Sequence, residues 1–153
     1  MVTEMTKDIP PESMIYNEEN IDQKRTEMRE MMSHITETNK ETIEKNTPLV
    51  DISDFEIEAE PGVMIKIYMI RPKSLPKENN AAYIYAHGGG AVMFDAAIEN
   101  DGMMVTALNL QCVVFNVDYR LGPEAKAPKG QCDMAAAVRH VSKNALNYGV
   151  DKN

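Results

Sequence analysis

The sequence has no tryptophan, only two cysteines, and no long apolar run. Its longest uninterrupted apolar stretch, Ala81 to Ala86, has six residues, whereas a membrane-spanning helix needs about 20. Cys112 and Cys132 fit neither a disulfide framework nor the paired ligand spacing of a zinc site. We expect both cysteines to be small buried hydrophobic residues, and we expect neither a metal nor a cofactor.

Basic residues are scarce as well. The chain carries 16 Lys and Arg against 24 Asp and Glu, and the basic residues form no cluster. Binding to a phosphate backbone needs such a cluster, so nucleic acid is a poor candidate partner. Residues 1–13 contain acidic residues and two prolines where a secretory signal would have an apolar core. We therefore expect a cytoplasmic protein without a membrane span.

The charge is unevenly distributed along the chain. Residues 1–60 carry 6 basic and 16 acidic side chains, whereas residues 61–153 carry 10 and 8. The length of 153 residues and the hydrophobic content of 43% are sufficient for a folded core. We expect two regions: an acidic helical region over residues 1–50, and a core region over residues 51–153.

The acidic region is predicted to form one long helix, with Asn17 as its N-cap and its end near Asn46. Six apolar residues recur along it mostly at helical spacing: Ile21, Met28, Met31, Met32, Ile35 and Ile43. We expect this stripe to pack against the rest of the protein. The adaptable methionine side chains would also suit a surface that covers an apolar pocket.

The core region reads as a hairpin followed by two strand-helix units. A Pro61-Gly62 turn separates two stretches with strand patterning, and the later apolar runs lack clean alternation, as strands covered on both faces do. The predicted elements are strands at 55–60 and 63–70, a loop at 72–80, a strand at 81–86, a helix at 96–110, a strand at 112–117 and a helix at 129–148. This order describes half of a parallel α/β sheet.

The first buried strand runs directly into His87-Gly88-Gly89-Gly90, which we call the glycine loop. It lies at the carboxyl end of the strand, where open α/β sheets place their ligands. Three consecutive glycines remove every Cβ and permit positive φ, so backbone N–H groups can converge on a small anion. The spacings of phosphate-binding loops, G-x-G-x-x-G and G-K-[ST], are absent. The oxyanion of a reacting carbonyl is therefore the better match.

The second buried strand ends in Asp118-Tyr119-Arg120-Leu121-Gly122-Pro123-Glu124, which we call the DYRLGPE segment. The two motifs, in this order and at this distance, resemble the hormone-sensitive-lipase branch of the α/β-hydrolase carboxylesterases, which includes arylacetamide-deacetylase-like enzymes. In lipases and esterases, the HGGG loop supplies an N–H of the oxyanion hole. The resemblance covers the whole chain. It implies a partial α/β-hydrolase fold with an N-terminal cap helix, a β-hairpin and parallel strand-helix units, incomplete without a C-terminal segment.

The resemblance also implies roles for the glycine loop. Gly89 and Gly90 correspond to the backbone donors that stabilise the oxyanion of the tetrahedral intermediate, and Gly88 corresponds to the residue that shapes the turn. His87 corresponds to a residue that anchors the loop, and it is not expected to be the catalytic histidine.

The DYRLGPE segment is expected to support the glycine loop. The resemblance implies that Asp118, Tyr119 and Arg120 brace the loop from the neighbouring strand by hydrogen bonds and charge pairing. The chain departs from the family's pattern in three places: Gly122 replaces an alanine, residues 125–128 lack an aromatic before the proline, and His140 stands near a usual tryptophan. We expect these departures to change the shape of the pocket and to leave the fold in place.

The catalytic triad of such an esterase is missing. It requires a serine in a G-x-S-x-G elbow, then an acidic residue, then a histidine. None of the five serines lies between glycines after a strand; they are Ser13, Ser33, Ser53, Ser74 and Ser142. We therefore expect this chain to contain no nucleophile, acid or base of the triad, and to be inactive in isolation.

A further polypeptide segment is expected to complete the protein. In the family's strand order, the serine strand pairs beside residues 81–86, which would otherwise form an exposed apolar edge. We expect a C-terminal segment, cleaved or separately encoded, to carry the serine, the acid and the histidine.

Two functions remain as hypotheses. In the first, the chain supplies the cap and the oxyanion hole of a carboxylic ester hydrolase that acts on small-molecule esters. In the alternative, it is a non-catalytic α/β-hydrolase-like binding or structural module with an apolar ligand under the methionine-rich helix. The intact glycine loop favours the first, because a pure binding pocket needs no convergent backbone donors.

Overall fold

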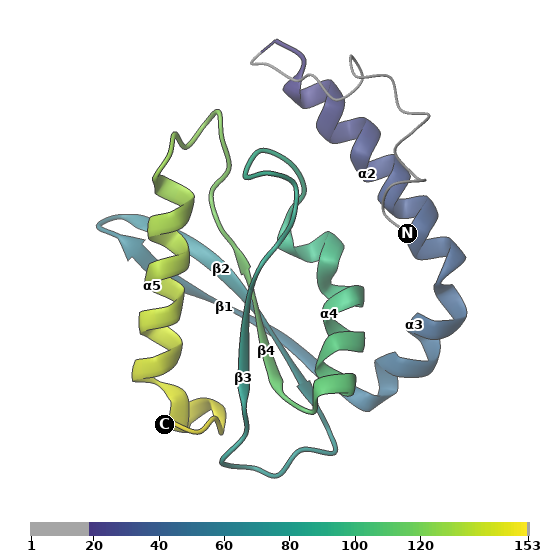
Figure 1. Cartoon of the computed structure of the whole chain (residues 1–153), viewed down its shortest axis with the longest axis vertical. Helices are drawn as coiled ribbons and strands as arrows, with labels where there is room; N and C mark the ends of the chain where they lie inside the picture. Colours follow the sequence, from purple (N-terminus) through teal and green to yellow (C-terminus); the bar gives the residue numbers. More distant parts are fainter. Residues whose placement is uncertain (1–18, 153) are drawn as a thin grey trace.

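The computed structural model describes residues 19–152, which form one mixed sheet with helices on both faces (Figure 1). The elements are α2 (Ile21–Thr38), α3 (Lys40–Asn46), η2 (Thr47–Leu49), β1 (Val50–Glu60), β2 (Val63–Pro72), β3 (Ala82–Ala86), α4 (Ala96–Leu110), β4 (Val113–Asp118), α5 (Lys129–Lys143) and η3 (Ala145–Tyr148). Helix α5 lies on one face of the sheet, and α4 lies on the other with α2 and α3 outside it. This arrangement confirms the predicted partial α/β-hydrolase fold. Over the described range, no helix combines the length and apolarity needed to cross a membrane.

The sheet has the strand order β1-β2-β4-β3. β1 and β2 pair antiparallel as the predicted hairpin, β2 and β4 also pair antiparallel, and β3 and β4 pair parallel. The parallel register places Ala86 opposite Val117. Since both strands run the same way, the residues that follow them emerge at the same edge of the sheet, which we call the site edge.

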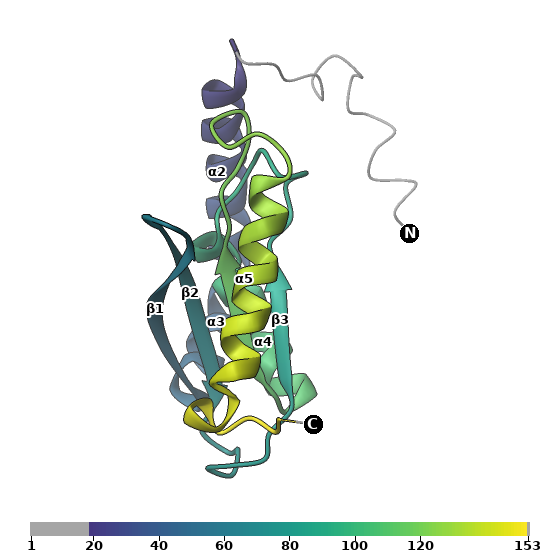
Figure 2. The same cartoon turned by 90° about the vertical axis from the view of Figure 1, so that its left-hand side faces the viewer.

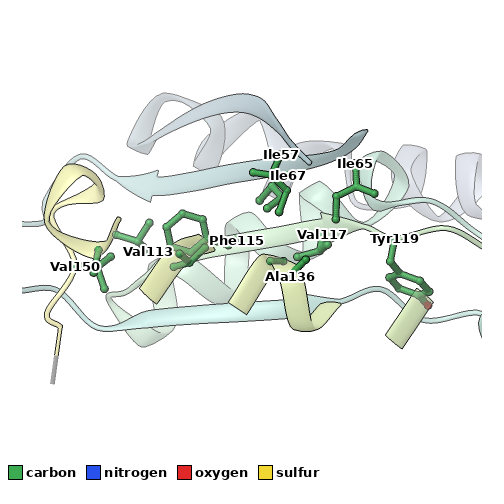
Figure 3. Close-up of a cluster of buried hydrophobic side chains, with 12 residues drawn as sticks. Ile57, Ile65, Ile67, Val113, Phe115, Val117, Tyr119, Ala136 and Val150 are labelled. Carbon is green, nitrogen blue, oxygen red and sulfur yellow. The ribbon is translucent and has the colours of Figure 1, made fainter. Parts of the chain in front are cut away.

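β4 is the buried centre of the sheet, as predicted for residues 112–117. Its side chains alternate between the two faces, because successive residues of a strand point to opposite sides. Val113, Phe115 and Val117 belong to the core under α5, whereas Val114 belongs to a smaller core under α4. Figure 3 shows Phe115 among the side chains of the larger core, between the strands and α5. This double burial fixes the position of β4 and therefore of the segment that follows it.

Residues 81–86 were predicted to form a strand covered on both faces, and this prediction is wrong for β3. Ala82 and Ala86 are exposed, and Tyr83 retains 39% of its accessible surface. The reason is position: β3 is an edge strand, with β4 as its neighbour on one side. On its other side, the described chain makes one isolated parallel bridge, between Asn80 and Val150.

The predicted N-terminal helix is divided. α2 begins at Ile21 after the N-cap Asn20, and it ends before Asn39, where α3 takes over; the predicted cap Asn17 lies outside the described residues. The apolar stripe is only partly packed, since Ile21 is buried but Met31 and Ile35 remain 47% and 44% exposed. Figure 2 shows why: α2 extends past the end of the sheet, where it covers loops more than strands.

The remaining elements follow the predictions closely. The helix predicted over residues 96–110 is α4, and the helix predicted from residue 129 is α5, continued by η3 to the left-handed Gly149. Cys112 is buried as expected, and burial raises the pKa of its thiol. The expectation for Cys132 is wrong: it is exposed, because it lies on the solvent-facing side of α5.

Candidate functional site

The site edge brings the two sequence motifs into contact. The His87 side chain is buried, with 3% of its surface accessible, and it stacks on the Tyr119 ring at a centroid distance of 4.3 Å. The Tyr119 hydroxyl donates a hydrogen bond to the His87 carbonyl at 2.8 Å, and burial raises the pKa of that hydroxyl. The Nδ1 atom of His87 lies 2.9 Å from the Gly88 carbonyl, and this contact favours a proton on Nδ1. His87 is therefore buried against Tyr119 and holds the glycine loop to the DYRLGPE segment.

The last two glycines of the loop adopt a backbone conformation that other residues rarely reach. Gly89 and Gly90 have φ of +97° and +63°, in the region that favours glycine. A Cβ on Gly89 would lie 2.2 Å from the Met93 carbonyl oxygen, so the tight approach of the chain excludes any side chain. The Gly89 carbonyl accepts hydrogen bonds from Val92 and Met93 N–H at 3.2 and 3.0 Å. These bonds close the turn that follows the glycines.

The three glycine N–H groups have different environments. The Gly88 N–H donates to Oε1 of Glu99 on α4 at 2.9 Å. Within residues 19–152, the N–H groups of Gly89 and Gly90 donate no hydrogen bond. Two adjacent backbone donors are thus available to an acceptor at the carboxyl edge of the sheet.

Within the described residues, Asp118 and Arg120 make no hydrogen bond or ion pair to the glycine loop. Oδ1 of Asp118 accepts a hydrogen bond from Ala96 N–H at 3.1 Å, at the start of α4. The Arg120 guanidinium pairs with the fully buried Asp133 at 2.7 Å and with Glu60 at 2.7 Å. Of the three residues expected to brace the loop, Tyr119 bonds to it directly. The other two bond instead to the start of α4 and, through Asp133 and Glu60, to α5 and the end of β1.

Arg25 on α2 joins the N-terminal helix to the DYRLGPE segment and to the turn that follows the glycine loop. Its Nε donates to the Val92 carbonyl at 2.9 Å, and its Nη2 donates to the Gly122 carbonyl at 2.8 Å. The same guanidinium pairs with the Glu124 carboxylate at 2.5 Å and lowers the pKa of Glu124 to about 2. The loops are also tied to one another, since Gly122 N–H donates to the Ala91 carbonyl at 2.9 Å.

Sequence reasoning missed Arg25 and Glu99. No signal in the sequence pointed to Arg25, because its partner Glu124 already has two basic residues within four positions, Arg120 and Lys126. Nothing in the sequence selects a partner 99 residues away. Glu99 carried no signal beyond its place in the first turn of a predicted helix.

Besides an open hollow of about 500 Å³ between α2 and the start of α4, two hollows adjoin these elements. One, of about 330 Å³, lies beside Gly90 and is lined by both motifs and the start of α5, including Gly122 and Lys126. The other, of about 430 Å³, lies between α2, α3 and α4. Its apolar lining consists of Met32, Ile35, Ile43, Ile98, Met103 and Val105.

The described residues offer no triad. Ser33, Ser53, Ser74 and Ser142 lie on α2, on β1, after β2 and on α5, and Ser13 lies outside the described residues. None of these four serines is hydrogen-bonded to a histidine in the described range. Nor do residues 19–152 contain a group of three His, Cys, Asp or Glu side chains placed to hold a metal ion.

Comparison with known proteins gives consistent matches. Residues 83–153 match a family model described as alpha/beta hydrolase fold. An arylesterase of Saccharolobus solfataricus is 27% identical over 133 residues, which cover 86% of this chain and 42% of the arylesterase. Esterase LipI of Mycobacterium tuberculosis is 32% identical over 106 residues, which cover 68% of this chain and 32% of LipI. The solved structure of a bacterial heroin esterase superposes with a TM-score of 0.75 at 20% identity, over 86% of this chain and 40% of that one. The chain thus spans less than half the length of these relatives.

Proposed function

This chain belongs to the hormone-sensitive-lipase-like α/β-hydrolase family of carboxylesterases, and we propose that it supplies the oxyanion hole and cap of a carboxylic ester hydrolase. Gly89 and Gly90 are the proposed backbone donors, and Gly88 shapes the loop. His87 anchors the loop and takes no part in proton transfer. The proposed substrates are small-molecule carboxylic esters, in keeping with the printed names of the relatives, arylesterase and esterase.

One observation carries the proposal. Of three consecutive glycine N–H groups, the first is bound to Glu99, and the next two are unpaired in the described structure. Backbone donors held in this way cost no reorganisation when negative charge develops on a substrate oxygen. Loss of one such donor in subtilisin lowered kcat by roughly 10² to 10³. Gly89 is partly exposed and Gly90 is exposed, so an external acceptor can reach these N–H groups.

The chemistry requires groups that another segment would supply. A serine hydroxyl on that segment attacks the ester carbonyl carbon, while a histidine of the same segment takes the serine proton. The carbonyl oxygen becomes an oxyanion that accepts hydrogen bonds from Gly89 and Gly90. The intermediate collapses to an acyl-serine as the histidine gives its proton to the departing alcohol. Water then attacks the acyl-serine by the same route and releases the carboxylic acid.

The open edge of β3 supports a place for this segment. Asp151 N–H donates to the Asn80 carbonyl at 2.8 Å, and Asn80 N–H donates to the Gly149 carbonyl at 3.1 Å. The chain after η3 thus already runs parallel to the approach of β3. A strand that continued along β3 in this direction would end at the site edge, beside the glycine loop. A serine at the end of that strand would face Gly89 and Gly90.

Labelling with a fluorophosphonate, which modifies activated serines, tests the proposal. The natively purified protein is treated with the reagent and examined by intact-mass spectrometry and peptide mapping. We expect the adduct on a serine outside residues 1–153. A protein that carries the expected serine elbow yet acquires no adduct and hydrolyses no ester would contradict the proposal. An adduct on Ser33, Ser53, Ser74 or Ser142 would contradict the assignment of the nucleophile to another segment.

The hollow between α2, α3 and α4 favours one second candidate, a non-catalytic module that holds an apolar ligand. Its apolar lining includes Met32 and Met103, and methionine adapts to irregular ligands. Titration with an apolar fluorescent probe, repeated on Met32→Glu, would test this role. Saturable binding that Met32→Glu abolishes, together with an absence of fluorophosphonate labelling, would favour the binding module over the hydrolase.

A further inference from the structure

Glu99 places a carboxylate directly against the glycine loop. It lies in the first turn of α4 and is partly buried. Its Oε1 accepts the Gly88 N–H at 2.9 Å, and its Oε2 accepts the Tyr85 hydroxyl at 2.5 Å. One side chain therefore joins the end of β3, the glycine loop and α4. The fit is close, since a Cβ on Gly88 would lie 3.3 Å from Glu99 Oε1.

The start of α4 does not need this carboxylate as a cap. Asp95, the N-cap residue, accepts the Ile98 N–H at 3.0 Å. Asp118 accepts the Ala96 N–H at 3.1 Å. These two acids accept hydrogen bonds from N–H groups in the first turn of the helix, as capping residues do. Glu99 accepts hydrogen bonds instead from the Gly88 N–H and the Tyr85 hydroxyl.

A negative charge next to a developing oxyanion is unfavourable by Coulomb repulsion. A carboxylate at this position must therefore favour catalysis in another way that outweighs this repulsion. The hydrogen bonds indicate one: by holding the Gly88 N–H, Glu99 fixes the plane of the His87–Gly88 peptide. The following N–H groups of Gly89 and Gly90 remain outside this contact. The charge is moderated by the Tyr85 hydroxyl, which donates a hydrogen bond to Oε2 of Glu99; burial raises the pKa of this hydroxyl to about 12.

We propose that Glu99 is a positioning residue for the oxyanion hole, acting through the Gly88 N–H to orient the peptides of Gly89 and Gly90. This inference rests on the proposed function, since it assigns Glu99 a task in that same site. It predicts that the hydrogen bond to Gly88 matters for turnover and that the negative charge itself does not.

Two substitutions separate the hydrogen bond from the charge. Glu99→Gln keeps an acceptor for Gly88 N–H and removes the charge, whereas Glu99→Ala removes both. In the hydrolase with its serine segment present, we expect Glu99→Ala to lower kcat by roughly 10-fold to 10²-fold with little change in KM, because a small misplacement of catalytic groups costs up to about 10² in rate. We expect Glu99→Gln to restore kcat to within a few-fold of wild type. Asp101→Ala, on the same helix but without a hydrogen bond to the loop, is the matched control.

A second readout does not depend on activity. The chain contains one His-Gly dipeptide, His87-Gly88, so ¹³C-carbonyl histidine combined with ¹⁵N-glycine selects the Gly88 amide of this chain by NMR. A charge-assisted bond to Glu99 shifts this amide proton downfield. We expect an upfield change in Glu99→Gln and a larger one in Glu99→Ala, with none in Asp101→Ala.

The two readouts distinguish the possible failures. An unchanged Gly88 resonance in Glu99→Gln would overturn the inference, and so would an unchanged kcat in Glu99→Ala. Equal losses of kcat in Glu99→Gln and Glu99→Ala would also overturn it, because the charge would then be the essential feature. A protein that hydrolyses no ester would contradict the proposed function instead, and with it the positioning role. If Glu99→Ala does not fold, Glu99→Gln and Tyr85→Phe still test the contact through the Gly88 resonance.

Discussion

The segments that follow β3 and β4 lie side by side at the site edge, but their polar groups are used in opposite ways. The glycine loop after β3 leaves the N–H groups of Gly89 and Gly90 unpaired in the described structure. The DYRLGPE segment after β4 pairs its charged side chains, with Arg120 bound to Asp133 and Glu124 bound to Arg25. One segment presents donors, and the other is fixed in place.

This difference follows from the positions of the two strands. β4 is buried on both faces, so the segment after it starts from a rigid base and can hold neighbouring elements. β3 is an exposed edge strand, so the loop after it depends on contacts from other elements. Tyr119 after β4 and Glu99 on α4 bond to the glycine loop, and Arg25 on α2 bonds to Val92 just beyond it. The glycine loop therefore gains its rigidity from its neighbours, and each contact can be tested separately.

The largest expected effect is a loss of folding stability at the DYRLGPE segment. Asp133→Ala leaves the Arg120 guanidinium without the partner that it binds through Nε and Nη2, and removes the acceptor for Arg120 N–H. Asp133 is fully buried, and breaking a buried pair by removing one partner costs about 3–5 kcal/mol. Urea unfolding would measure the loss. Asp54→Ala, which removes an exposed ion pair with Lys66, should cost less than about 1 kcal/mol; equal losses would deny that burial is the cause.

The next effect is on the glycine loop and concerns turnover more than folding. Gly89→Ala would place a Cβ 2.2 Å from the Met93 carbonyl oxygen, so the turn must move and the N–H groups of Gly89 and Gly90 lose their alignment. We expect kcat of the complete hydrolase to fall by roughly 10² to 10³. Gly102→Ala is the matched control, since its Cβ meets nothing within 4 Å and a helical alanine stabilises by about 0.5–1 kcal/mol. Comparable kcat values in the two variants would refute the role of Gly89.

Much of this comparison could be foreseen from the sequence. The three consecutive glycines and the apolar runs before each motif predicted two parallel strands with a donor loop at their carboxyl ends, because these signals are local. Contacts between distant residues could not be foreseen. The 99-residue separation of Arg25 and Glu124 has no sequence signature, and α2 carries acids and bases in many positions. The exposure of β3 escaped prediction for a related reason, since apolar content does not show which strand lies at an edge.

A smaller effect is expected where α2 meets both segments. Arg25→Ala removes charge-assisted hydrogen bonds to the carbonyls of Val92 and Gly122, and we expect a loss of about 1–2 kcal/mol in unfolding free energy. Arg29→Ala, one turn further along α2, removes a single exposed contact to Asp95 at 3.4 Å and should lie within about 0.5 kcal/mol of wild type. If the two variants unfold at the same urea concentration, Arg25 does not hold the helix against the loops.

The smallest effect is a pH dependence of the stability that the Arg25–Glu124 pair contributes at the DYRLGPE segment. Arg25 lowers the pKa of Glu124 to about 2, below the value of about 4.3 for an unperturbed glutamate. A carboxylate whose pKa is lower in the folded state adds stability that is full above its unfolded pKa and disappears as pH falls through its folded pKa. The stability difference between wild type and Glu124→Gln should therefore shrink as pH falls from about 4.3 to about 2. It should be small throughout, because the Glu124 side chain is 60% exposed and water screens such pairs. Urea unfolding at several pH values would measure the difference, and a difference independent of pH would mean that the pair contributes through packing of the Arg25 side chain and not through charge.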